Sequence, residues 1–64
     1  MNRRNFEEHL RDHGCEFLHR GGKHDIWWNP SNEKLSSVPR HRTLRKGTVR
    51  AVCRELNVPR PDGL

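Results

Sequence analysis

Hydrophobic residues recur along the chain with two different periods, and each change of period marks a boundary between predicted elements. Phe6 and Leu10 lie four residues apart, as on one face of a helix, and Gly14 follows as a helix-stop signal. Asn5 and Glu8 have the spacing of a capping pair at the start of such a helix. The pattern predicts a first helix over about residues 5–13, which ends just before the glycine.

The middle of the chain alternates between apolar and polar positions, as strands do. We expect strands over about residues 15–20, 24–28 and 35–38. Two glycines separate the first pair, and the proline-containing turn at residues 29–32 separates the second. Pro39, which has no backbone N–H to donate, suits the end of the third strand. Such short connections predict an antiparallel meander.

The last element is predicted to be a helix over about residues 46–56. Its apolar residues keep the i, i+3, i+4, i+7 spacing of a core-facing stripe, namely Val49, Val52, Cys53 and Leu56. Gly47 is costly inside a helix and is therefore expected in the first turn. Asn57 and Pro59 are helix-ending residues, and residues 59–64 are expected to form a loose tail.

The predicted order is helix, three strands, helix, within a single domain over residues 1–64. Each helix has only one apolar stripe, so both helices are expected on one face of the sheet. This is a two-layer α+β domain, α-β-β-β-α, of the double-stranded-RNA-binding type.

Two neighbouring tryptophans must point to opposite faces of the second strand. Parity groups Ile26 with Trp28, so Trp28 is expected to pack against the helices. Trp27 shares the side of Asp25 and is expected to be the more exposed ring. It is then a candidate to stack on a base or to anchor a protein partner, although a surface aromatic without function is equally compatible.

Composition limits the class of protein. The 64 residues are 30% hydrophobic and 33% charged, which is enough for one domain with a small core. No apolar run approaches the ~20 residues of a membrane span, and the charged start does not resemble a signal peptide. We expect a cytoplasmic protein.

Positive charge is concentrated in the second half of the chain. Residues 1–33 hold five basic and six acidic side chains, whereas residues 34–64 hold eight basic and two acidic ones. No acidic residue interrupts the segment from residue 40 to 54, as expected of a site for a polyanion such as RNA, although a solvated basic face is the alternative. The candidate RNA-binding residues are Arg42, Arg45, Lys46, Arg50 and Arg54, together with Lys23.

The segment between the first two predicted strands is a glycine hinge, residues 21–23. Gly21 and Gly22 allow backbone dihedrals closed to other residues and let a large ligand approach the main chain. Lys23 adds positive charge, and His24 follows at the start of the second strand. A tight turn with a solvated histidine is the simpler reading of the same residues.

No metal or cofactor site is predicted. His9 and His13 are four residues apart, like a zinc pair on a helix, but the glutamate of a His-Glu-x-x-His site and a third ligand are both missing. Cys15 and Cys53 are too few for a disulfide framework, and we expect both to be reduced and partly buried.

Four short motifs over residues 5–58 resemble, in order and spacing, those of the HicA family of toxins. They are Gly14, Gly22-Lys23-His24, Val38-Pro39-Arg40-His41 and Leu44-Arg45-Lys46-Gly47-Thr48.

The resemblance implies a bacterial or archaeal mRNA interferase, the toxin of a type II toxin-antitoxin pair. Such a toxin is held inactive by a HicB-type antitoxin and is expected to be a monomer when free. The catalytic histidine of the family corresponds to His24. The chain departs from the family pattern at Lys23, where serine is usual, and at Asp25, where a second histidine is common.

Cleavage chemistry agrees with that expectation. RNA cutting needs a base that takes the proton of the 2′-hydroxyl, and imidazole titrates near neutrality, which suits His24. Lys23, Arg40 and His41 are candidates for catalytic support, with His41 as the second proton carrier. No carboxylate cluster suggests a magnesium site. Two alternatives stay open: a non-catalytic RNA-binding module of the same fold, and an inactive toxin relic that binds an antitoxin.

Overall fold

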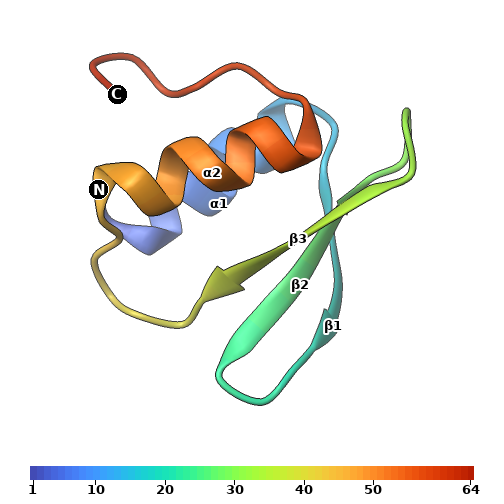
Figure 1. Cartoon of the computed structure of the whole chain (residues 1–64), viewed down its shortest axis with the longest axis horizontal. Coiled ribbons are helices and arrows are strands. Elements are labelled where there is room, and N and C mark those ends of the chain that lie inside the picture. The colour runs from blue at the N-terminus through green and yellow to red at the C-terminus, as the bar shows by residue number, and fades with distance from the viewer.

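The computed structural model describes all 64 residues and confirms the predicted order and fold class. The elements are α1 (Arg3–Asp12), β1 (Glu16–Arg20), β2 (His24–Asn29), β3 (Lys34–Pro39) and α2 (Lys46–Leu56). The strands form an antiparallel sheet in the order β1-β2-β3. Both helices lie on one side of this sheet (Figure 1). Neither helix is long and apolar enough to cross a membrane.

The first helix begins two residues earlier than predicted, because the cap is Asn2 and not Asn5. The side chain of Asn2 accepts a hydrogen bond from the backbone N–H of Asn5 (3.2 Å). Asn2 also forms an isolated antiparallel bridge with Thr43, and the N–H of Arg3 donates to the carbonyl of Arg42 (2.9 Å). These long-range contacts, which the sequence does not reveal, tie the start of α1 to the segment before α2.

Both helices end as predicted and in the same manner. Gly14 has φ 84° and Asn57 has φ 56°, the left-handed conformation that stops a helix. In each case the N–H of the following residue bonds to the carbonyl five residues back, at 2.9 Å. The two residue types differ, but both tolerate this conformation.

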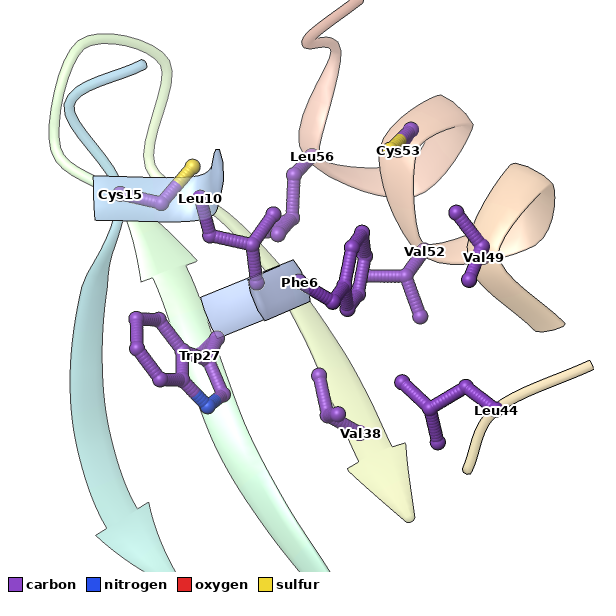
Figure 2. Packing of buried hydrophobic residues seen from close by; sticks show 10 residues of the cluster. All are labelled: Phe6, Leu10, Cys15, Trp27, Val38, Leu44, Val49, Val52, Cys53 and Leu56. Carbon is purple, nitrogen blue, oxygen red and sulfur yellow. The ribbon is translucent and has the colours of Figure 1, made fainter. Parts of the chain in front are cut away.

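One core cluster fills the space between the helices and the sheet (Figure 2). The predicted stripe of α2 is fully buried, and so are Phe6 and Leu10 of α1. The cluster consists of Phe6, Leu10, Cys15, Trp27, Val38, Leu44, Val49, Val52, Cys53 and Leu56. Because all five elements or their flanks contribute to it, the cluster holds the ends of the strands in fixed positions relative to the helices.

The prediction for the two tryptophans is wrong in its choice of face. Trp27 is 1% exposed and lies in the core, whereas Trp28 is half-buried on the helix-free side. The ring of Trp27 packs edge-on against Phe17, with centroids 6.1 Å apart, and the guanidinium of Arg11 lies 5.0 Å from its centroid. Trp27 is therefore not available to stack on a base or to anchor a partner.

Polar residues on both sides of Trp27 in the sequence made its face of the strand look solvent-exposed, although both of them have partners within the chain. We call the side of Trp27 the covered face and the side of Trp28 the open face. Asp25, on the covered face, pairs with Arg40 (3.0 Å), and the Asn29 side-chain amide donates to the carbonyl of Leu56 (2.9 Å). A polar side chain with such a partner can be buried without an unsatisfied group. The alternation was predicted correctly, but not which face is covered.

Candidate functional site

The glycine hinge, residues 21–23, closes the hairpin between β1 and β2. The N–H of Gly21 donates to the carbonyl of His24 (2.8 Å), and a Cβ at Gly21 would lie only 2.7 Å from that oxygen. A Cβ at Gly22 would meet open space. Neither glycine has a positive φ, so the expectation of unusual dihedrals is wrong. Glycine is required at position 21 because a larger residue there would clash with the backbone carbonyl of His24.

Arg40 clamps the hinge from the end of β3. Its guanidinium donates to the carbonyls of Gly21 (3.1 Å) and Gly22 and to the carboxylate of Asp25 (3.0 Å). Its backbone N–H donates to the carbonyl of Lys23 (3.3 Å). The Asp25 and Arg40 side chains are 14% and 24% exposed, so this ion pair is largely shielded from solvent. The partners in these bonds are separated by 15 to 19 positions in the sequence, and no periodicity of the sequence indicates such pairs.

His24 is exposed at the start of β2 and faces Pro39 of β3. Strand alternation places its side chain on the open face, on the same side as Ile26 and Trp28. The histidine hydrogen bonds within the chain belong to other positions, so the imidazole of His24 is free to meet a ligand. Lys23 beside it is exposed as well. The hinge thus combines a fixed backbone with two accessible ionisable side chains.

Comparison with protein-family models matches residues 3–58 to the HicA toxin of bacterial toxin-antitoxin systems. The chain belongs to the HicA toxin family. No curated protein and no solved structure matches it significantly. Membership confirms the resemblance and makes the protein a toxin of a toxin-antitoxin system, with an antitoxin partner, an RNA target and an endoribonuclease role in general terms.

The second predicted proton carrier of this HicA chain lies just beyond β3. His41 is exposed and lines a hollow of about 260 Å³ with Pro39, Arg45 and Thr48. Since Pro39 is the strand partner of His24, this hollow adjoins the residue that faces the hinge histidine. The fold brings the candidate residues of the hinge and of the segment after β3 to the same end of the sheet.

Three of the basic residues predicted to bind RNA form a row on HicA α2. Lys46, Arg50 and Arg54 are exposed on the helix, whereas Arg42 precedes it and lies beside the start of α1. The tail turns back along the helix, and the side chain of Arg50 donates to the carbonyl of Leu64 (3.1 Å). Leu64 also packs against the core cluster, so the tail expected to be loose covers part of this row.

The other polar candidates occupy structural positions in the HicA fold. No three His, Cys, Asp or Glu side chains are grouped closely enough to hold a metal ion. The ring of His9 hydrogen-bonds with the carbonyl of Pro59 (2.6 Å), and the ring of His13 with the carbonyl of His9 (2.9 Å). Both cysteines are free and buried, and burial raises the pKa of the Cys15 and Cys53 thiols.

Proposed function

We propose that this HicA toxin is an mRNA interferase in which His24 carries out general acid-base catalysis without a metal ion, so that cutting mRNA inhibits translation. The observation that carries the proposal is the placement of an exposed imidazole at the end of a clamped hairpin. A catalytic group must be both accessible to substrate and held in a defined position. Among the five histidines, His24 combines these two properties within one of the four motifs that resemble the HicA family.

The reaction is a transesterification within the RNA backbone. His24 takes the proton of a 2′-hydroxyl, and the oxygen attacks the adjacent phosphorus. The bond from phosphorus to the 5′-oxygen breaks, and this leaving oxygen takes a proton from His41. The products are a 2′,3′-cyclic phosphate and a free 5′-hydroxyl. Acid-base catalysis of this kind accelerates a reaction by about 10²- to 10⁴-fold per group.

Negative charge that develops on the phosphoryl oxygens needs nearby cations. Lys23 and Arg45 are exposed and have no ion-pair partner, which supports a direct role for them. Arg40 was also a candidate for this role, but its guanidinium already donates to two carbonyls of the hinge and to the carboxylate of Asp25. These bonds support a positioning role for Arg40, which holds the backbone that carries Lys23 and His24.

Substitution of His24 tests the catalytic proposal. In buffer containing EDTA, His24→Ala should lose cleavage of a labelled RNA by at least about 10²-fold and keep the unfolding midpoint of the wild type, because the side chain packs against nothing in the core. His19→Ala is the matched control, since it removes an exposed imidazole of β1 that, like that of His24, makes no hydrogen bond within the chain. Cleavage by His24→Ala at the wild-type rate would rule the mechanism out. A wild-type chain that binds RNA without cutting it would favour a non-catalytic module.

The antitoxin partner is proposed to be of HicB type, with an acidic surface that covers His24 and the open face of the sheet. The open face leaves Leu35 54% exposed and Trp28 half-buried, so a partner can bury apolar area there. The exposed basic residues around the hinge favour an acidic partner through faster association. Protection of the amides of residues 22–28 from hydrogen exchange on adding the antitoxin is the expected result. Tight binding that leaves these amides unprotected would place neutralisation elsewhere.

A further inference from the structure

An open pocket of about 470 Å³ lies at the start of α1, next to the segment that follows β3. No hydrophobic residue lines it, and four of its six lining residues are arginines. The residues are Asn2, Arg3, Arg4, Asn5, Arg40 and Arg42. Arg3 and Arg4 come from the half of the sequence that has more acidic than basic residues, so the charge pattern did not identify this surface.

Backbone pairing between distant segments assembles the pocket. The terminal amine of Met1 donates to the carbonyl of Leu44 (2.8 Å), and the N–H of Leu44 donates to the carbonyl of Met1 (2.7 Å). The N–H of Arg3 donates to the carbonyl of Arg42 (2.9 Å). These bonds hold the first turn of α1 beside the segment between β3 and α2, and the arginines of both meet at one place.

The positive charge of the pocket is only partly compensated within the protein. Arg3 lies near Glu7 (3.7 Å), and Arg40 pairs with Asp25 (3.0 Å). Arg4 and Arg42 have no carboxylate within ion-pair distance. The first turn of α1 has no acidic residue, although this end of a helix carries partial positive charge. The arginines therefore repel one another in the free protein, and such an uncompensated cost is typical of a binding site.

We propose that this pocket binds a backbone phosphate of the RNA strand that is cut at His24, an inference that rests on the proposed function. Arginine guanidinium groups match phosphate oxygens through paired hydrogen bonds. The absence of apolar and aromatic lining favours a charged group over a base or an apolar side chain of a protein. Arg40 lines the pocket and also holds the hinge, so one side chain connects the phosphate site with the catalytic segment.

A polyanion fits better than a single acidic side chain, because the arginines continue past the pocket. A second hollow, of about 380 Å³, shares Arg3 and Arg40 with the first and adds Arg11 and Arg20. It also contains the carboxylates of Glu7 and Asp25, which pair with Arg3 and Arg40, so four arginines there outnumber two acidic residues. Because the two hollows share lining residues, they adjoin each other as one groove, lined from α1, the segment after β3, β1 and β2. Successive phosphates of an extended strand would meet successive arginines along this groove.

The test compares two pairs of substitutions that remove the same charge. In a His24→Ala background, which keeps the RNA intact, Arg4→Ala with Arg42→Ala removes the two unpaired cations of the pocket. Lys34→Ala with Arg60→Ala removes two exposed cations outside it. Binding of a fluorescein-labelled single-stranded RNA is followed by anisotropy over a range of salt concentrations. Arg4→Lys with Arg42→Lys keeps the charge and removes the paired donors, and thermal unfolding verifies that each variant folds.

The double variant Arg4→Ala, Arg42→Ala should weaken RNA binding by about tenfold. It should also flatten the log-log salt slope by about 1.4, since each phosphate contact contributes about 0.7 for single strands. The control variant Lys34→Ala, Arg60→Ala should change the slope by much less. The affinity of the double lysine variant for RNA should lie between those of the wild type and of Arg4→Ala, Arg42→Ala. Equal losses of affinity in the two double alanine variants would overturn the proposed phosphate site. So would a loss of antitoxin binding with RNA binding unchanged. In both cases His24-dependent cleavage by the wild type would still stand, whereas failure of the proposed function would appear as a wild type that does not cut RNA, whether or not it binds RNA.

Discussion

The two faces of the sheet differ in how their polar side chains are satisfied, and the proposed catalytic residue His24 lies on the open face. The covered face carries Asp25, Trp27 and Asn29, and both the carboxylate of Asp25 and the side-chain amide of Asn29 have a partner within the chain. The open face carries His24 and Trp28, and the imidazole of His24 has no partner there. The comparison teaches that burial in this small sheet follows the availability of partners for polar groups more closely than the count of apolar residues on a side.

This difference also explains how so small a domain can keep an accessible site. A core of ten buried residues supplies limited stability, which leaves little tolerance for strain. The polar residues of the covered face reinforce the core, because they tie strands to helices: Ser36, for example, donates to Glu55 of α2 (2.5 Å). The open face contributes less to this framework. Substitutions on the two faces should therefore have different consequences.

The largest difference is expected between the two tryptophans. Trp27→Ala should lower the free energy of unfolding by about 3–5 kcal/mol, because it leaves a cavity beside Phe17 and Val38. Trp28→Ala should cost about 1 kcal/mol, because half of that ring already meets solvent. Urea denaturation measures both values.

Trp27→Phe sharpens the same comparison. The indole Nε1 of Trp27 is buried without an acceptor, so phenylalanine keeps much of the packing and removes an unsatisfied donor. This variant should retain more stability than Trp27→Ala. Equal costs for Trp27→Ala and Trp28→Ala would contradict the assignment of the covered face.

A smaller effect is expected for the amide that joins the turn after β2 to the end of α2. Asn29→Ala should cost about 1–3 kcal/mol, because it removes a buried donor from the carbonyl of Leu56 and an acceptor from the N–H of Ser31. Asn32→Ala, whose side chain donates to the same carbonyl from a more exposed position, is the control and should cost less. If Asn32 proved the more important residue, the buried amide would not be what anchors the turn.

The clamp on the hinge connects the two faces, since Arg40 meets Asp25 on the covered face and holds the strand that exposes His24 on the other. Arg40→Gln should lower the free energy of unfolding by about 1–2 kcal/mol. It should slow RNA cleavage by about tenfold to 100-fold, since displacement of a catalytic group is costly. Rates at saturating RNA separate positioning from binding, because a loss of position lowers the turnover number. An effect confined to the Michaelis constant would identify Arg40 as a phosphate contact, and Lys34→Gln controls for charge.

The smallest effect concerns the two thiols behind the covered face. Burial raises the pKa of Cys15 and Cys53, so at neutral pH the reactive thiolate is scarcer than in an exposed cysteine. Alkylation of the native protein should be slow, and it should accelerate as the pH rises above the usual range of a thiol. In urea both cysteines should react at the rate of a free thiol. Rapid labelling of the native chain at neutral pH would show that the core opens readily.

Local patterns predicted much of this architecture. The α2 stripe ending in Leu56, the stops at Gly14 and Asn57, and strand ends within one or two residues followed from spacing and residue type alone. These features depend on neighbours within about five positions, and periodicity records such neighbours. The cap at Asn2 was missed, because a bridge to a residue in the second half of the chain fixes the start of α1.

The candidate site shows the same boundary between local and tertiary information. The sequence by itself placed His24 after a glycine turn and Lys23 beside it, because both belong to one short segment. Only the tertiary structure decided that Arg40 clamps that turn, that Trp27 is buried, and that Arg4 and Arg42 share a pocket. Each of these outcomes depends on which distant group satisfies a polar atom or a charge, and the free energy of that pairing is defined only when the whole chain has packed.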